Sequence, residues 1–196
     1  MSERRTPEDF DARYDGTPPP WDICRPQKAF AELELRGRVL DIGCGTGEHA
    51  LMAAAKGFEA TGIDAAPRAI AIAEGKAAER GLSARFVIWN ALELGKLGEQ
   101  FDTVLDCGLF HVFGDEDRAR YVGGLRAAIP AGGRYFMLCF SDSQPGDWGP
   151  RRVTRGEIEA SFADGWRIDS IEPAILEITI DANGARGWLA SISRVS

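Results

Sequence analysis

Residues 38–64, RVLDIGCGTGEHALMAAAKGFEATGID, decide the fold. This stretch joins an apolar run (38–42), a loop with glycines at 43, 45 and 47, an alanine-rich run (48–56) and a second apolar run (58–63). A buried strand, a glycine loop, a helix and a second strand form the repeating unit of a doubly wound parallel sheet. The stretch therefore predicts an α/β fold with a ligand site at the glycine loop.

Short apolar runs continue to alternate with amphipathic ones in the rest of the chain. Because the first five runs are almost continuously hydrophobic, they are expected to form parallel strands covered on both faces. The last two strands are separated only by residues 181–184 and are expected to form an antiparallel hairpin that turns at Asn183-Gly184. The sequence predicts a Rossmann-like, doubly wound, seven-stranded sheet of five parallel strands plus this C-terminal antiparallel hairpin. The remaining strands are expected at 84–89, 101–106, 134–140, 166–179 and 187–194.

The predicted helices carry recognisable ends. Gly57 follows the alanine-rich run, where glycine commonly ends a helix in the left-handed conformation. Residues 67–80 begin with proline and stop before glycine, the usual asymmetry of helix ends. Asp115 is expected to cap the next helix. Thr154 and Glu157 have the spacing of a capping box.

The 196 residues, 21.3 kDa, fit one domain. Residues 1–37 are expected to form an N-terminal lid or cap segment, and residues 38–196 the main domain. Two amphipathic pieces, 7–15 and 26–35, lie in the lid segment on either side of three consecutive prolines, which favour an extended chain.

The composition excludes several classes of protein. The net charge of −7 opposes binding to a phosphate backbone, and Arg4-Arg5 and Arg151-Arg152 are too short to form a basic patch. The start of the chain has no apolar signal-peptide core, and no stretch approaches the roughly 18 apolar residues of a membrane span. We expect a cytoplasmic monomer or homodimer that contacts neither nucleic acid nor membrane.

The cysteines at 24, 44, 107 and 139 do not suggest a metal or disulfide framework. They are far apart in sequence and include no C-x-x-C pair. We expect reduced, mostly buried thiols and no metal site.

Charged residues flank the glycine loop. Gly43, Gly45 and Gly47 have the spacing G-x-G-x-G, whereas a dinucleotide-binding loop would place its third glycine at position 48. Asp41 precedes the loop and Glu48 follows it, so a pyrophosphate would meet two carboxylates. A positively charged ligand would be attracted instead, and S-adenosylmethionine carries an ammonium and a sulfonium group. The alternatives are an NAD-dependent oxidoreductase and a module that holds the cofactor without catalysis.

Further cofactor contacts are expected where the next strands end. Asp64 closes the second strand, where a carboxylate accepts hydrogen bonds from ribose hydroxyls, although it could also cap the following helix. The third strand ends before Asn90, whose amide suits a base edge, although a turn role is the alternative. The residues predicted to bind the cofactor are Asp41, Gly43, Cys44, Gly45, Asp64, Ala65, Asn90, Ala91, Leu92 and Asp106.

The segment VLDIGCGTG (39–47), followed by TGID (61–64), resembles the class I S-adenosylmethionine-dependent methyltransferases, and the similarity extends over residues 38–140 in motif order. The segment PPPWDICRP (18–26) is similar to T-P-W-D-x-G-x-x-P of the thiol, halide and thiopurine methyltransferases, with Ile23-Cys24 in place of x-Gly. The resemblance implies S-adenosylmethionine as cofactor and methyl transfer as the reaction. It also implies that the N-terminal segment covers the cofactor, which assigns Trp21 to the cofactor and acceptor sites.

The fourth strand leads to candidate acceptor residues. His111 is a candidate catalytic base for a phenol, hydroxyl or thiol, or else a structural group that hydrogen-bonds the backbone. Methyl transfer to a thiolate or phenolate needs no base. We expect methylation of an O, S or N atom of a small aromatic or heterocyclic acceptor, or of a thiol or halide. The residues predicted to bind the acceptor are Tyr14, Trp21, Phe110, His111 and Trp148.

Overall fold

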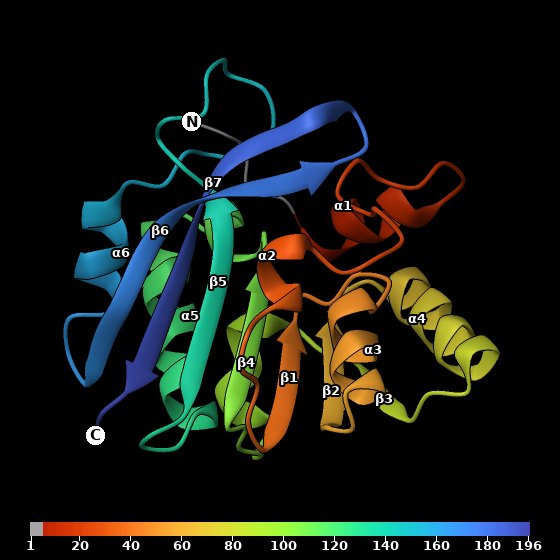
Figure 1. The fold of residues 1–196 in the computed structure, drawn as a ribbon, viewed down its shortest axis with the longest axis horizontal. Helices are drawn as coiled ribbons and strands as arrows, with labels where there is room; N and C mark the ends of the chain where they lie inside the picture. The colour runs from red at the N-terminus through yellow and green to blue at the C-terminus, as the bar shows by residue number, and fades with distance from the viewer. Residues whose placement is uncertain (1–5) are drawn as a thin grey trace.

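A seven-stranded sheet runs through residues 6–196, which the computed structural model describes (Figure 1). Residues 1–5, with Arg4-Arg5 and the start of the predicted lid segment, lie outside the described residues. The strand order is β3-β2-β1-β4-β5-β7-β6, and only the pairs that involve β7 are antiparallel. This confirms the predicted five parallel strands and C-terminal antiparallel pair. The strands are β1 (Arg38–Ile42), β2 (Glu59–Asp64), β3 (Ala84–Ile88), β4 (Thr103–Cys107), β5 (Arg134–Phe140), β6 (Trp166–Ile178) and β7 (Asp181–Arg194).

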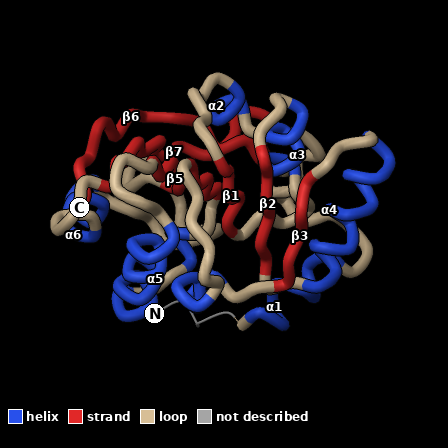
Figure 2. Tube along the Cα trace, turned by 90° about the horizontal axis from the view of Figure 1, so that it is seen from below, coloured by secondary structure: helices blue, strands red, loops and turns tan. Residues whose placement is uncertain are grey.

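Helices cover both faces of the sheet (Figure 2). α2 and α3 lie against one face, whereas η2, α5 and α6 lie against the other. None of the helices within residues 6–196 is long and apolar enough to cross a membrane. The helices are α1 (Pro7–Asp11), η1 (Ala12–Tyr14), α2 (Lys28–Ala31), α3 (Glu48–Ala55), α4 (Pro67–Arg80), η2 (Ala91–Lys96), η3 (Phe110–Val112), α5 (Asp115–Ala128) and α6 (Arg155–Ser161).

Strand β5 shows why the parallel strands are continuously apolar. Tyr135 and Met137 pack into the cluster under α5, whereas Phe136 and Leu138 pack into the cluster under α2 and α3. Alternate side chains of a strand point to opposite faces, so a strand covered on both faces has no polar side. Full burial of such a side chain contributes roughly 1.5–3 kcal/mol. The two layers of helices thereby hold in place the carboxyl ends of β1, β2 and β4, which lie at the same end of the sheet.

The C-terminal hairpin turns earlier than predicted. β6 and β7 are joined at Thr179-Ile180, and Asn183-Gly184 lies inside β7. The pairing register shifts between Leu176 and Ile178, and Gly184 takes a φ of +67° in the bulged part of β7. The prediction was wrong because Asn-Gly suits a bulge with positive φ as well as a tight turn.

Helix α5 also differs from the prediction at its start. Gly114 is the N-cap residue, and Asp115 is the first helical residue. The Asp115 carboxylate accepts from Arg118 at 2.7 Å and lies at the positive end of the helix dipole. The capping box of α6 is confirmed, since Thr154 and Glu157 bond each other's backbone N–H groups.

Candidate active site

Three glycines shape the loop between β1 and α3. Gly43, Gly45 and Gly47 have φ values of +69°, +52° and +85°, which side chains rarely adopt. The Gly45 N–H donates to the Asp64 carboxylate at 2.8 Å, and the other Asp64 oxygen accepts from the Ala66 N–H at 2.9 Å. Each carboxylate oxygen has a second lone pair. The end of β2 is thus hydrogen-bonded to the glycine loop, and the Asp64 carboxylate can accept further hydrogen bonds.

The ring of Phe86 packs closely against Gly47 of this loop and Gly62 of β2. A Cβ atom on Gly47 would lie 2.7 Å from the Phe86 ring, and one on Gly62 would also lie 2.7 Å from it. The Cys44 thiol packs against Gly62 as well, so only the backbone of Cys44 is available to a ligand. The role of Phe86 was not predicted, although Gly62 inside β2 indicates that another group approaches this strand closely.

Asp41, at the end of β1, has one buried oxygen without a partner. Oδ2 accepts from the Ala50 N–H at 3.1 Å, whereas Oδ1 has no hydrogen bond within residues 6–196. His49 Nδ1 lies 3.8 Å from Oδ1, but burial lowers the pKa of His49 to about 4, so its ring is neutral. Burial, with Asp64 and Asp106 nearby, raises the pKa of Asp41 to about 8. A carboxyl group in this state is suited to a cationic ligand, which restores its ionised form.

Glu48 is neutralised by two side chains of α4. Lys76 and Arg80 each approach its oxygens to 2.8 Å. Although burial opposes ionisation, these hydrogen bonds hold the pKa of Glu48 below its usual value. The expectation that Glu48 presents a free carboxylate to a ligand was wrong, because sequence analysis did not pair it with residues about thirty positions away. The charge argument for a cationic ligand then depends on Asp41 alone.

Tyr14 and Trp21 lie over the glycine loop. A Cβ atom on Gly45 would be 2.9 Å from the Tyr14 hydroxyl oxygen, which accepts from Trp21 Nε1 at 3.1 Å. Burial and the neighbouring Asp64 raise the pKa of Tyr14, so its hydroxyl stays protonated. The prediction assigned Tyr14 to the acceptor site, whereas in the structure Tyr14 lies against Gly45 of the glycine loop.

Several hydrogen bonds hold the N-terminal segment in place. Asp11 accepts from the Arg68 N–H of α4 at 2.8 Å. Asp22 accepts from the Thr46 hydroxyl at 3.0 Å, and Lys76 Nζ bonds that hydroxyl at 2.7 Å. Sequence analysis missed Thr46 and Lys76, because the residues that meet Asp22 come from two separate elements.

Further hydrogen bonds join the same segment to the C-terminal hairpin. The Gln27 side chain accepts from the Glu177 N–H at 2.8 Å and donates to the Glu177 carbonyl at 2.9 Å. Gln27 thereby replaces the strand partner that Glu177 lacks at the β7 bulge. The Thr179 N–H donates to the Pro20 carbonyl at 2.9 Å. The segment is fixed on both sides of Trp21.

The end of β3 lies beside Asp64. The Trp89 N–H donates to the Asp64 carbonyl at 2.9 Å. The Asn90 side-chain oxygen accepts from the Leu92 N–H at 2.9 Å and caps η2, while Ala91 is buried. This is the turn role left open for Asn90, and within residues 6–196 the side-chain amino group forms no hydrogen bond.

Asp106 lies in the core. Its oxygens accept from the hydroxyls of Tyr121 and Tyr135 at 2.8 and 2.6 Å and from the N–H groups of Leu109 and Phe110 at 2.8 and 3.3 Å. Burial raises the pKa of Asp106 while these bonds lower it. The predicted cofactor role does not fit, because Asp106 is fully buried and lies on the opposite face of the sheet from Asp41.

His111 does not have the geometry of a general base. Its Nδ1 accepts from the Phe140 N–H at 3.0 Å, so the neutral ring carries its proton on Nε2, which faces Gly108. Burial, with Arg151 and Arg152 nearby, lowers the pKa of His111 to about 3. Nε2 has no hydrogen-bond partner in the described part of the chain. His111 is therefore a neutral donor, which fits the structural hypothesis.

Of the predicted acceptor aromatics, Phe110 is fully buried. It packs on Phe162, with 6.0 Å between ring centroids, and Arg118 covers its other side. Its assignment to the acceptor does not fit, because the side chain belongs to the core under α5 and α6.

Trp148 lies on a loop held by Arg152. Its ring meets the Phe140 ring at 5.6 Å between centroids, and Phe140 meets His111 at 5.3 Å. Trp148 is 37% exposed, and Phe140 contacts both its ring and that of His111. Arg152 donates to the backbone carbonyls of Gln144, Pro145, Gly146, Trp148 and Pro150.

Comparisons with known proteins identify the family of the chain. A family model described as a methyltransferase domain matches residues 39–133. The 2-heptyl-1-hydroxyquinolin-4(1H)-one methyltransferase of Mycobacteroides abscessus is 36% identical over 177 residues, 87% of this chain and 76% of that protein. The demethylmenaquinone methyltransferase of Thermus thermophilus is 40% identical over 114 residues, 57% of this chain and 51% of that protein.

A solved structure shares nearly the whole fold. It comes from work on the conversion of a disulfide bond into a thioacetal group during echinomycin biosynthesis. It is 35% identical, with a TM-score of 0.87, and the match covers 97% of this chain and 93% of that chain.

The fold and the glycine-loop site define a Rossmann-like methyltransferase. The chain belongs to the class I S-adenosylmethionine-dependent methyltransferases. It is thus an enzyme that uses S-adenosylmethionine, and the alternatives of an NAD-dependent oxidoreductase and a non-catalytic module are set aside.

Proposed function

We propose that the protein methylates an oxygen, sulfur or nitrogen atom of a small aromatic or heterocyclic molecule. The names of two relatives support this class, since a hydroxyquinolone and a demethylmenaquinone are ring compounds. S-adenosylmethionine supplies a methyl group on a positively charged sulfur. The acceptor atom forms a bond to the methyl carbon as the carbon–sulfur bond breaks and its electron pair passes to sulfur; a neutral acceptor also loses a proton.

The unpartnered Oδ1 of Asp41 is the observation that carries the cofactor placement. We assign it to the ammonium group of S-adenosylmethionine. The ammonium donates a charge-assisted hydrogen bond, and a buried carboxyl group without a partner is costly. Gly43 and Gly45 allow the cofactor to approach the backbone, with Cys44 contributing its main chain.

The other cofactor contacts follow from the neighbouring strand ends. The spare lone pairs of Asp64 suit the ribose hydroxyls, with Ala65 beside them. Asn90, Ala91 and Leu92 are assigned to the adenine, and the free amino group of Asn90 can donate to a ring nitrogen.

We assign the described part of the 1–37 segment as a lid over the cofactor. Tyr14 and Trp21 cover Gly45, and the contacts of Asp22 and Gln27 fix the segment on both sides. The lid excludes water from the reacting groups, which aligns the acceptor, methyl and sulfur in a dry site.

On the acceptor side, we assign His111 as a positioning donor. Its Nε2–H can donate to an acceptor oxygen or to an anionic atom next to the one that reacts. With Nδ1 occupied, His111 takes up no proton, so acceptors that arrive ionised are favoured. Trp148 offers a ring face at the same side.

A sulfur acceptor is a second candidate. The PPPWDICRP segment resembles that of thiol methyltransferases, and Cys24, which stands in place of its glycine, has a φ of +53°. This is the left-handed backbone that glycine adopts freely. The 35% identical structure also comes from work on sulfur chemistry.

Calorimetry and product detection test the proposal. S-adenosylhomocysteine should bind the wild type and the control Asp164→Asn, which changes an exposed carboxylate, but bind Asp41→Asn far more weakly. Mass spectrometry should then detect a methylated product from a hydroxyquinolone, a phenol or a thiophenol. Equal affinity in Asp41→Asn contradicts the cofactor placement. Methylation of aliphatic acceptors or proteins alone contradicts the acceptor class.

A further inference from the structure

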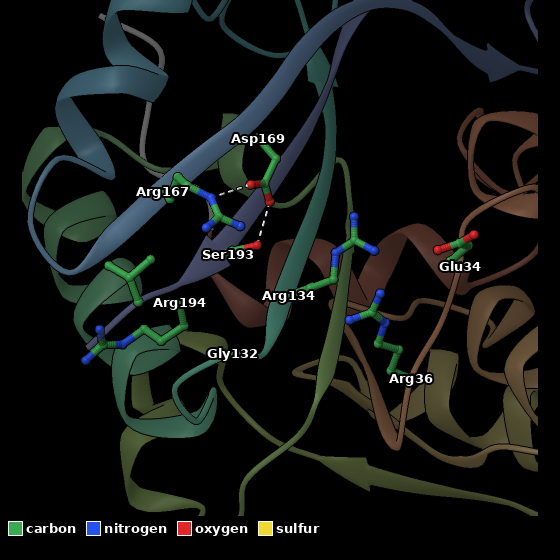
Figure 3. A pocket seen from close by; sticks show the side chains of 9 residues that line it. Glu34, Arg36, Gly132, Arg134, Arg167, Asp169, Ser193 and Arg194 are labelled. Atoms are coloured by element: carbon green, nitrogen blue, oxygen red, sulfur yellow. Dashed lines mark hydrogen bonds and ion pairs between the residues drawn. The ribbon is translucent and has the colours of Figure 1, made fainter.

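An open cavity of about 610 Å³ lies where the parallel strands β1 and β5 begin, at the opposite end of these strands from the glycine loop. Figure 3 shows the side chains that line it. Arg36, just before β1, and Arg134, the first residue of β5, line it together with residues of β6 and β7. In a chain with a net charge of −7, four arginines line this one cavity: Arg36, Arg134, Arg167 and Arg194.

The strand register gathers these side chains on one face. Arg134 of β5 is opposite Ser193 of β7, which is opposite Arg167 of β6. Residues directly opposite each other share a face of the sheet. The charge of Arg167 is matched, since Asp169 accepts from Arg167 Nε at 2.7 Å and from the Ser193 hydroxyl at 2.5 Å.

Two carboxylates, Glu34 and Asp169, line the cavity together with the arginines. Although burial opposes ionisation, hydrogen bonds from Ser193 and Arg167, with Arg134 nearby, lower the pKa of Asp169.

The Arg134 guanidinium donates to the Ser191 hydroxyl at 3.2 Å and stacks 4.6 Å above the Phe136 ring. Arg36 is held by its backbone, whose N–H and carbonyl bond the Thr103 hydroxyl at 2.9 Å. Within residues 6–196, neither arginine forms an ion pair with a carboxylate within 4.0 Å.

Figure 3 shows that the two groups extend into the same part of the cavity, whereas Arg194 points away from them. Arg194 is used elsewhere, since it donates to the Gly165 carbonyl at 2.6 Å. Two guanidinium groups so placed repel each other unless an anion lies between them. Their donors form forks that match the oxygens of phosphate and carboxylate groups.

We propose that this cavity binds a compact dianion, a phosphate ester or a dicarboxylate, between Arg36 and Arg134. Both ligand types offer two negative charges on oxygen atoms that planar guanidinium donors can hold. The site is separate from the methyl-transfer site, because it lies where β1 and β5 begin, whereas the glycine loop follows the end of β1.

Titration calorimetry at constant ionic strength tests the proposal, with pyrophosphate and malonate as probes. We expect saturable 1:1 binding of at least one probe to the wild type. Arg36→Gln and Arg134→Gln should each weaken it about tenfold, the effect of losing one charge-assisted bond. Arg120→Gln is the matched control, because Arg120 is 53% exposed, lies outside this cavity and approaches Glu93 to 3.6 Å.

S-adenosylhomocysteine provides the second readout. Its affinity should be unchanged in all three variants, which shows that they fold, and saturation with it should leave probe binding unchanged. A stronger response to pyrophosphate indicates a phosphate ester, and a stronger response to malonate a dicarboxylate. The absence of saturable binding by both probes overturns the proposal, as does equal affinity in Arg36→Gln and Arg134→Gln or competition by S-adenosylhomocysteine.

Discussion

The indole N–H of Trp21 donates to the hydroxyl oxygen of Tyr14 at 3.1 Å, and the two rings meet nearly at right angles. This bond joins two aromatic residues of the N-terminal segment directly above Gly45. Removing it should loosen the segment without disturbing the sheet, because neither side chain belongs to the two core clusters.

Tyr14→Phe should therefore weaken binding of S-adenosylhomocysteine about two- to tenfold, the range of one net hydrogen bond. Trp21→Phe should have a similar effect through the same bond. The double variant should be less affected than the sum of the two, since the bond can be lost only once. Calorimetry on all four proteins measures this coupling, and full additivity would show that the bond contributes nothing.

Asp41 should make cofactor affinity depend on pH. In the free protein its pKa is about 8, and an ammonium ligand requires the ionised form, so binding near pH 7 should release a proton. Affinity for S-adenosylhomocysteine should rise by up to about tenfold per pH unit below pH 8. Calorimetry in two buffers of different ionisation enthalpy counts the proton. Asp41→Asn should lose this pH dependence, and a flat wild-type profile would exclude the ammonium contact.

His111 should leave no ionisation in the pH–rate profile. Its pKa is about 3, so when S-adenosylmethionine is saturating, kcat/KM for a thiol should follow only the ionisation of the thiol. His111→Asn, which keeps an acceptor for the Phe140 N–H, should slow thiol and phenol acceptors by similar factors. A base role would instead give a wild-type ionisation near pH 6–7 that the variant lacks.

The same residue should affect stability in acid. Because the folded-state pKa of His111 is below the unfolded value of 6.5, its contribution to stability is lost as pH falls from about 6.5 toward 3. Relative to His111→Asn, the wild type should lose about 1.4 kcal/mol of unfolding free energy per pH unit below pH 6. Urea denaturation at pH 7, 6 and 5 measures the difference. A constant difference would mean that folding does not lower the pKa of His111.

Gly47→Ala should be more destabilising than Gly57→Ala. Both glycines have a φ near +86°, at +85° and +87°, but a Cβ on Gly47 would meet Phe86 at 2.7 Å, whereas nothing lies within 4 Å of one on Gly57. Backbone strain accounts for about 1–2 kcal/mol in both, and overpacking adds about 1–3 kcal/mol at Gly47. Equal losses in urea denaturation would show that Phe86 moves aside freely.

The sequence predicted the sheet and the glycine loop well, because local patterns determine them. The predicted cofactor contact of Asp106 failed because Asp106 and Asp41 lie on opposite faces of the sheet. Asp41 pairs with Leu105 across β1 and β4, so Asp106 is one residue further on and points to the opposite face. A single apolar run predicts a strand but not the register that decides which acidic side chain enters the site.

Long-range partners account for the other differences. Glu48 meets Lys76 and Arg80, which lie on one side of α4, and no pattern around Glu48 predicts them. The hairpin turn depended on the bulge opposite Glu177, whose backbone is satisfied by Gln27. In both cases the deciding contact joins elements that no local window of sequence contains.

The bond between Gln27 and Glu177 spans 150 residues, and it has a consequence for biosynthesis. The segment above the glycine loop is translated before the sheet, whereas the strand that carries Glu177 is translated 150 residues after Gln27. A nascent chain that stops before β6 can hold the segment only through Asp11 and Asp22, because the partners of Gln27 and Pro20 are still missing. Tight retention of S-adenosylmethionine should therefore begin only after β6 has left the ribosome.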